Sequence, residues 1–149
     1  MAFENNLATQ KRFAEAVMTR DLRIFDEVVA SNAIDHDPAP DQGPGPEGYR
    51  HFFGELLTAF PDLNLTIEHM VADEDNIAFA YMMTGTHQGT FMGLAPTNKP
   101  IRVRGIQISK FANGKLVERW GSSDQLGILQ QLDCALPHNL DKQLASGKP

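Results

Sequence analysis

The segment IRVRGIQISKFANGKLVERWGSSD, residues 101–124, decides the fold of this chain. Residues 101–111, which are rich in Ile and Val, are expected to form a strand. Asn113 and Gly114 follow, and an Asn-Gly pair readily adopts the positive φ angles of a tight hairpin turn. Residues 116–124 then form the partner strand. The sequence therefore predicts an antiparallel hairpin that ends near Asp124.

Two further strands are expected before this hairpin, over LNLTIEHMV (63–71) and IAFAYMMTGTHQG (77–89). In the first, strict alternation puts His69 on the same face as Leu65, Ile67 and Val71, and we expect it to be a core histidine. The turn ADEDN separates the two runs. Together with the hairpin, they predict a meander of four strands.

The first part of the chain has helical periodicity. Apolar residues recur at steps of three and four through 3–21, and a short helix capped by Asp21 is expected over 21–30. A third helix is predicted over 46–60, where Pro46 suits the first turn. A short closing helix is expected over 125–136. Helices followed by strands indicate one segregated α+β domain, residues 1–136, with a C-terminal tail over 137–149.

Composition limits the possible partners. The chain has 149 residues, a net charge of −6 and no run rich in Lys or Arg, which disfavours nucleic acid and anionic membranes as partners. The N-terminal residues do not resemble a signal peptide, and no apolar run could span a bilayer, so we expect a cytoplasmic protein. Cys134, the single cysteine, cannot form an intramolecular disulfide. Phosphate-loop, serine-hydrolase, zinc-protease and paired-cysteine motifs are absent.

His36 lies in the most irregular stretch, IDHDPAPDQGPGPEG, residues 34–48. It could belong to a metal site, act in acid–base chemistry or stabilise a turn. On an extended segment, Asp35 and Asp37 would point away from His36, so we expect no metal. The turn-stabilising and pocket-facing interpretations of His36 both stay open.

Asp124 also has two interpretations. It directly precedes the predicted closing helix, and Asp is a good N-cap residue. It also shares the strand parity of Glu118, Trp120 and Ser122. In an apolar surrounding its protonated form would be favoured, which would suit it to proton transfer near neutral pH.

Four segments together resemble the SnoaL-like polyketide cyclases, members of the nuclear transport factor 2-like, or ketosteroid-isomerase-like, superfamily. The segments are DHDP, GPEGYRHFFGELLTAFPDL, GTHQGTFMGLAPTNKPIRVRGI and NGKLVERWGSSDQLGILQQL, and the likeness covers roughly residues 5–133. The resemblance implies a cone-shaped α+β barrel, with N-terminal helices packed in a strongly curved, mostly antiparallel sheet. It also implies a homo-oligomer, a dimer or tetramer formed through the sheet.

For the true cyclases, the resemblance implies an intramolecular aldol condensation that uses no cofactor and closes a ring of a polyketide ester. Asp124 stands in the place of the family's acid–base carboxylate, and His36 matches the polar rim of the pocket. Some cyclases carry a histidine where this chain has Gln107 and Ser109. A second donor would then be missing, or supplied by His36 or His87.

The pocket must be mostly apolar to hold such a ligand, and methionine and aromatic side chains suit irregular or flat molecules. The residues expected to contact the substrate are Tyr49, Phe53, Phe79, Tyr81, Met83, His87, Phe91, Met92, Gln107 and Trp120. The same pocket without a poised carboxylate would serve a non-catalytic module that binds a small apolar or aromatic metabolite. Another enzyme on the same fold, such as an isomerase or an epoxide hydrolase, is a third alternative.

Overall fold

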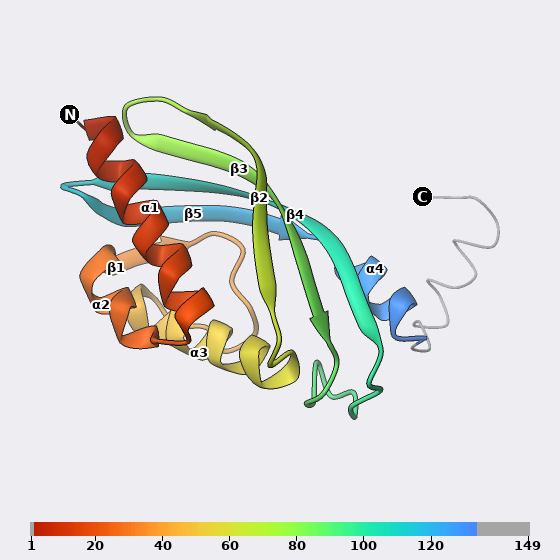
Figure 1. Cartoon of the computed structure of the whole chain (residues 1–149). Helices are drawn as coiled ribbons and strands as arrows, with labels where there is room; N and C mark the ends of the chain where they lie inside the picture. Colours follow the sequence, from red (N-terminus) through yellow and green to blue (C-terminus); the bar gives the residue numbers. More distant parts are fainter. Residues whose placement is uncertain (1, 134–149) are drawn as a thin grey trace.

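The structure, a computed structural model, describes residues 2–133 of the chain (Figure 1). The strands are β1 (Val29–Asp35), β2 (Asn64–Ala72), β3 (Asn76–Thr86), β4 (Pro100–Ala112) and β5 (Lys115–Ser123). The helices are α1 (Ala2–Thr19), the 3-10 turn η1 (Leu22–Ile24), α2 (Phe25–Val28), α3 (Gly45–Ala59) and α4 (Gln125–Gln131). The expected tail, residues 137–149, and Cys134 lie outside the described residues.

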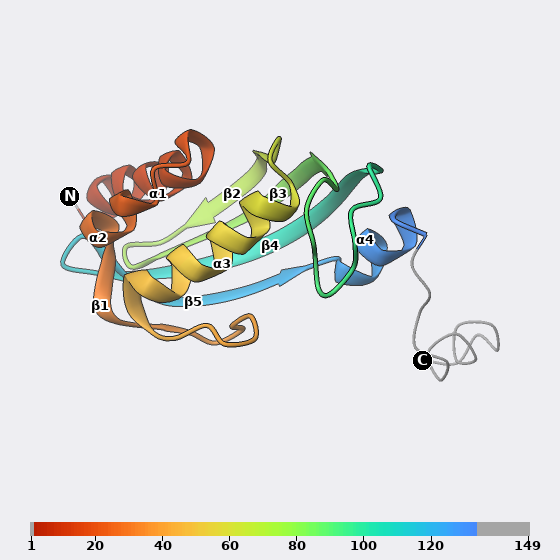
Figure 2. The ribbon, with the colours of Figure 1, turned by 90° about the horizontal axis from the view of Figure 1, so that it is seen from below.

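The five strands form one sheet in the order β1-β5-β4-β3-β2. β1 runs parallel to β5, and the other neighbouring pairs are antiparallel. The sheet is not closed, because β1 and β2 remain its two edges. α1 and α3 lie on one face of the sheet and α4 continues from the end of β5 (Figure 2). The predicted α+β class and mostly antiparallel sheet are confirmed, with an open, curved sheet in place of a barrel.

The predicted hairpin is present between β4 and β5. Asn113 and Gly114 both have positive φ angles, 52° and 76°, as its turn requires. α3 begins at Gly45, whose φ is 72° and where a β-carbon would collide with the carbonyl oxygen of Ser31. Only glycine fits this close approach of α3 to β1.

An aromatic cluster holds the helices against the sheet. Phe13 of α1, Phe25 of α2, and Tyr49 and Phe53 of α3 are buried, with ring centroids 4.9–6.0 Å apart. Each such ring removes a large apolar area from water and adds a favourable edge or offset contact. This cluster fixes α3 relative to α1 and therefore sets the space between the helices and the sheet.

β1 was not expected from the sequence. The predicted helix over 21–30 ends at Val28, and β1 starts at Val29. Only Val29 and Ala33 of this strand are buried, and Ser31 and Asn32 are exposed, so the segment lacks the alternation that marks a strand. β1 is a strand because it pairs with β5, and its own sequence does not indicate this.

Two β-bulges change which side chains face the helices. In β2, Ile67 pairs with Tyr81 and His69 pairs with Ala80, so Glu68 is an extra residue. A one-residue shift moves every later side chain to the opposite face. The prediction of a core histidine at position 69 is therefore wrong: His69 is exposed, and Met70 faces the helices instead.

The second bulge lies in β5. Lys110 pairs with Glu118 and Phe111 pairs with Leu116, which leaves Val117 as the extra residue. Leu116 is buried, and beyond the bulge Arg119 and Ser123 face the helices while Trp120 points to the opposite face.

None of the helices in the described part of the chain combines the length and hydrophobicity that a membrane crossing requires.

Candidate functional site

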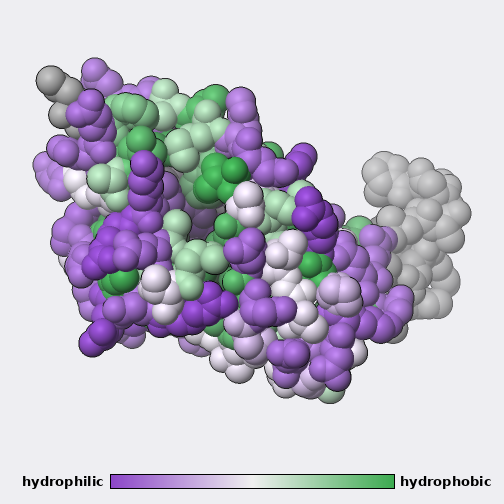
Figure 3. Space-filling model, in the orientation of Figure 1, coloured by the Kyte–Doolittle hydropathy of each residue, from purple (hydrophilic) through white to green (hydrophobic). Residues whose placement is uncertain are grey.

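A cavity of about 190 Å³ lies between α1, α3 and the inner face of the sheet. Hydrophobic side chains gather in the middle of this side of the molecule, with hydrophilic residues around them (Figure 3). The lining of the cavity is predominantly apolar: Leu7, Phe13, Ala14, Val17, Met18, Phe52, Phe53, Leu56, Leu65, Ile67, Met70, Phe79, Tyr81, Met83, Phe91 and Ile128. The polar side chains are Gln10, Lys11, Gln107, Arg119, Ser123 and Gln125. An apolar wall with a few polar groups is the usual character of a ligand site.

Arg119 is the buried cation of this lining. Its Nη1 lies 3.1 Å from both carboxylate oxygens of Asp35, and the two side chains are 12% and 6% exposed. Asp35 ends β1 and stands opposite Arg119 in the parallel β1–β5 pairing. The strand register therefore brings two charges that are 84 residues apart in the sequence into one ion pair.

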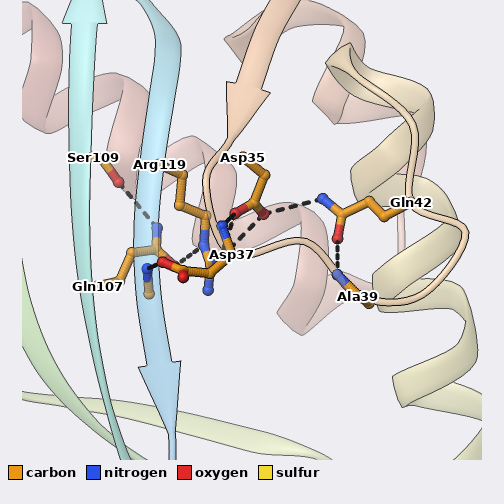
Figure 4. Close-up of polar contacts among 8 residues, drawn as sticks. Asp35, Asp37, Ala39, Gln42, Gln107, Ser109 and Arg119 are labelled. Carbon is orange, nitrogen blue, oxygen red and sulfur yellow. Dashed lines mark hydrogen bonds and ion pairs between the residues drawn. The ribbon is translucent and has the colours of Figure 1, made fainter.

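Further hydrogen bonds fix this ion pair in place (Figure 4). Arg119 Nε donates to Gln107 Oε1 at 2.9 Å, and Gln107 Nε2 donates to Ser109 Oγ at 3.0 Å. On the other side, Gln42 Nε2 donates to Asp35 Oδ2 at 3.0 Å, and the backbone N–H of Asp37 donates to Asp35 Oδ1 at 3.0 Å. A buried ion pair needs such additional partners to offset its loss of hydration.

Two tyrosines lie near the ion pair. Burial raises the pKa of Tyr81, whose side chain lines the cavity, although the charge of Arg119 acts in the opposite direction. Burial also raises the pKa of Tyr49, and the Asp35 carboxylate raises it further. Both phenols are therefore neutral near pH 7 and can donate hydrogen bonds. The Tyr49 hydroxyl is buried and has no hydrogen-bond partner among the described residues.

Six of the ten residues predicted to contact a substrate line the cavity: Phe53, Phe79, Tyr81, Met83, Phe91 and Gln107. Their contact with a substrate stays a prediction. Tyr49, His87, Met92 and Trp120 are not among the lining residues. Tyr49 belongs to the aromatic cluster, and Met92 is 62% exposed at a turn.

His87 is fully buried beside the loop that carries Phe91. Its Nδ1 lies 3.2 Å from the backbone nitrogen of Thr97, which can only donate, so Nδ1 accepts and Nε2 carries the proton. The ring packs against Phe60 and Phe91, and Nε2 has no partner among the described residues. In this structure His87 is hydrogen-bonded to the loop of residues 88–99. It does not line the cavity itself but packs against Phe91, which does.

His36 and Trp120 lie on the opposite face of the sheet from the helices, which we call the outer face. Their rings stack with centroids 4.6 Å apart, and His36 Nε2 lies 3.0 Å from Glu118 Oε1. This hydrogen bond lowers the pKa of Glu118. The bulge at Val117 explains the placement, because it turns Trp120 away from the cavity. Within one copy of the chain, the structure does not bring His36 near Asp124 or into the cavity lining.

Asp124 is exposed and caps α4, with its Oδ1 accepting a hydrogen bond from the backbone N–H of Gly127 at 2.8 Å. It is not a lining residue, but its neighbours Ser123 and Gln125 both are. Asp124 thus lies at the rim of the cavity and not in the desolvated position that proton transfer favours. Among the described residues, no group of three or more His, Cys, Asp or Glu side chains is arranged to hold a metal ion.

The sequence model of the SnoaL-like polyketide cyclases matches residues 8–132. The chain belongs to the SnoaL-like polyketide cyclase family. Similar solved structures include TsrD from Streptomyces laurentii, 23% identical with a TM-score of 0.81 over 89% of this chain and 97% of TsrD. IdmH from Streptomyces antibioticus, a proposed polyketide cyclase, is 29% identical with a TM-score of 0.74 over 86% of this chain and 98% of IdmH.

AclR from Streptomyces galilaeus, a proposed hydroxylase, is 27% identical, with a TM-score of 0.75 over 89% of this chain and 97% of AclR. No curated protein matches this SnoaL-like chain in sequence. The family and the fold are therefore established, and different activities have been proposed for proteins with this fold.

Sequence reasoning found Gln107 and Tyr81 but missed other polar residues of the cavity lining in this SnoaL-like protein. Arg119 was overlooked because alternation counted from Leu116 assigns Trp120 to the inner face. Gln10 of α1 was also overlooked; it is 4% exposed, lines the cavity and has a buried Oε1 without a partner among the described residues. A buried, unpaired amide oxygen beside a cavity is costly unless a ligand or water donates to it.

The Tyr81 ring lies across Gly105, its partner in the β3–β4 register, so that a β-carbon at position 105 would collide with the ring. We expect Gly105→Ala to lower the free energy of unfolding by about 1–3 kcal/mol, because the ring must leave its place in the cavity wall. In a Tyr81→Leu background the added methyl group should cost much less. Urea denaturation of the four proteins measures this coupling.

Gly54→Ala is the matched control for this prediction. Gly54 lies inside α3, and a β-carbon there would meet nothing within 4 Å, so alanine should be neutral or stabilising. An equal cost for Gly105→Ala with and without the Tyr81 ring would contradict the role assigned to that ring.

Proposed function

We propose that this SnoaL-like protein is a cyclase that closes a ring in a polyketide-like ester by intramolecular aldol condensation. The observation that carries the proposal is the apolar cavity with Arg119, Gln107 and Tyr81 at its polar end. Apolar walls suit the hydrocarbon frame of a polyketide. The polar groups suit its carbonyl oxygens.

The cavity size limits how much of the ligand enters. An apolar cavity of about 150 Å³ holds one benzene molecule, and pockets for drug-sized ligands have about 300–1,000 Å³. At about 190 Å³, this cavity accommodates one ring with its substituents. A polycyclic substrate would therefore place its reacting end inside and the remaining rings at the rim.

The reaction needs a base, an oxygen-binding group and an acid. A base removes a proton from the carbon next to one carbonyl, and the resulting enolate carbon attacks the carbon of a second carbonyl. One C–C bond forms, one C=O π bond breaks, and the new alkoxide takes a proton. No electrons enter or leave, so the reaction as written requires no redox cofactor.

We assign the proton transfers to Asp124. Only one of its oxygens accepts a hydrogen bond in the α4 cap, and Ser123 and Gln125 beside it line the cavity. By contrast, both oxygens of Asp35 already accept hydrogen bonds, from Arg119, Gln42 and the backbone of Asp37, and Asp35 is not among the lining residues. His36 takes no part in this proposal, because its ring lies on the outer face.

The test is a screen of polyketide-like β-keto esters for ring closure. The aldol addition that closes the ring leaves the mass unchanged, since an enol adds across a carbonyl within one molecule, and only a later loss of water from the product would lower it. The expected product is an isomer with a new chromatographic retention time, and in D₂O the starting ester should exchange its α-hydrogen faster with enzyme than without. Uptake of oxygen from ¹⁸O-labelled water would instead indicate a hydrolase.

A non-catalytic binding module is the second candidate, and one observation favours it. Among the described residues, no carboxylate lines the cavity. If aromatic ketones bind but no ester is converted and no α-hydrogen exchanges, the protein is a binding module.

We also propose that the outer face of the sheet joins a second copy of the chain. Val71, Ala78, Ile108 and Trp120 form a continuous apolar row across β2, β3, β4 and β5. Exposed apolar side chains on this face include Ile34, Val71 and Ile106, at 52%, 58% and 54% exposure. Such a patch is unusual on a monomer, and a two-fold axis would bury it against itself.

The proposed self-association predicts that Ile106→Glu shifts the protein to monomers, because a two-fold interface would then bury two unpaired carboxylates, one from each copy. Sedimentation velocity measures the change. Phe3→Glu is the matched control, since Phe3 is also exposed, at 41%, but lies on α1. A monomeric native protein would disprove the proposal.

A further inference from the structure

Arg119 has hydrogen-bond donors that the surrounding protein does not use. A guanidinium group carries five N–H groups. Nε donates to Gln107 and Nη1 reaches both oxygens of Asp35. Nη2 has no hydrogen-bond partner among the described residues. Arg119 lines the cavity and its side chain is 12% exposed, so the two N–H groups of Nη2 are the donors that it has left for a ligand.

Gly121 makes room for this part of the guanidinium. Gly121 follows Arg119 on the same face of β5, and a β-carbon there would collide with Nη2 and Cζ of Arg119. Ser123, the next residue on this face, lines the cavity. Without a side chain at position 121, the guanidinium lies directly over the backbone of β5, between the lining residues Arg119 and Ser123.

The guanidinium is also held in a fixed orientation. Asp35 and Gln107 accept hydrogen bonds from it on two sides. Asp35 in turn is hydrogen-bonded to Gln42, and Gln107 to Ser109. Donors fixed before a ligand arrives need little reorganisation when negative charge develops on the ligand. The Asp35 carboxylate offsets the net charge of Arg119 but leaves the direction of its free N–H groups unchanged.

We propose that Arg119 binds the acyl oxygen of the ligand through Nη2, with a preference for an oxygen that carries negative charge. This inference rests on the proposed function, in which that oxygen is the carbonyl that becomes the enolate. Asp35 and Gln107 are then positioning residues for Arg119. The ligand class is a compact aromatic or polyketide molecule with a carboxylate or enolisable acyl group on the ring that enters the cavity.

Lys11 is the other cation of the lining, and it gives a matched control. It is exposed on α1, whereas Arg119 is held at the buried end. An exposed lysine would attract anions to the cavity but would not orient them, whereas the two N–H groups of Arg119 Nη2 have a fixed direction. The net charge of −6 repels anions from the protein as a whole, so any preference for an anionic ligand must come from a local site.

The experiment compares 2-naphthoate with 2-acetylnaphthalene by isothermal titration calorimetry. The two probes have similar shapes, and only the first is charged at pH 7. We expect wild type to bind naphthoate about tenfold more tightly. Arg119→Met should abolish this preference, because it should weaken the binding of naphthoate much more than that of acetylnaphthalene, and Lys11→Met should retain the preference.

Four results would overturn the inference. They are equal binding of both probes by wild type, a preference that survives in Arg119→Met, a preference that disappears in Lys11→Met, and binding of neither probe. The last result also removes the aromatic ligand of the proposed function, whereas the first three leave that function in place. If Arg119→Met does not fold, the double variant Asp35→Asn/Arg119→Gln removes both charges together, and its loss of the preference is the expected result.

Discussion

Arg119→Met is expected to lower the free energy of unfolding by about 3–5 kcal/mol, a large share of the stability of a domain this size. The substitution keeps most of the apolar volume but leaves the Asp35 carboxylate, 6% exposed, without its cationic partner. An unpaired buried charge is far more costly than the pair itself. Equilibrium unfolding in urea, followed by circular dichroism, measures the loss.

Arg104→Met provides the control for this prediction. Arg104 pairs with Glu68 at the surface, with side chains 59% and 36% exposed, and exposed pairs contribute about 0–1 kcal/mol. Adding Asp35→Asn to Arg119→Met should recover a large part of the stability, because the unpaired charge is then removed. If the two arginine variants are equally stable, the Asp35–Arg119 pair is not buried in solution.

The hairpin, the long helices and most strands could be predicted because their signals are local. Asn113 and Gly114 specify a turn whatever surrounds them, and the steps of three and four in α1 follow from helix geometry alone. Local signals do not predict an element whose conformation depends on the strand it pairs with. β1 lacks an alternating pattern and forms a strand because β5 lies beside it.

The candidate site was harder to predict because a single extra residue reverses the faces of a strand. Val117 and Glu68 are the two extra residues, and each lies in a run that alternates acceptably without a bulge. Alternation carried through Val117 puts Trp120 in the cavity and Arg119 outside, which is the reverse of the structure. Six of the residues predicted to contact a substrate do line the cavity. Five of them lie on α3 or on strands without an extra residue, where no reversal of faces occurs, and the sixth, Phe91, lies in the loop after β3.

The Asp35–Arg119 pair illustrates a second limit. The partners are 84 residues apart, and the sequence between them contains both α3 and three strands. The parallel register of β1 and β5 puts them opposite one another, and nothing in either local sequence states that register. His36 was expected at the pocket rim. The structure instead buries the preceding residue, Asp35, in the ion pair with Arg119.

Asp124→Asn is expected to reduce turnover of a converted ester by about 10²–10⁴-fold, the usual contribution of a general acid–base group. Asparagine cannot take and return the proton, but it is as good an N-cap as aspartate, so it should keep the hydrogen bond from Gly127. The free energy of unfolding should therefore change by less than about 0.5 kcal/mol. Steady-state kinetics and urea unfolding of the same preparation measure both quantities.

Asp124→Ala separates the catalytic role from the capping role. It removes both the proton-transferring group and the cap, so it should lose activity to the same extent and also cost about 0.5–2 kcal/mol of stability. If Asp124→Asn turns over normally while Asp124→Ala is destabilised, Asp124 is only the cap of α4. The base would then have to come from outside the described cavity lining, which contains no carboxylate, and a binding function would become the better explanation of the apolar cavity.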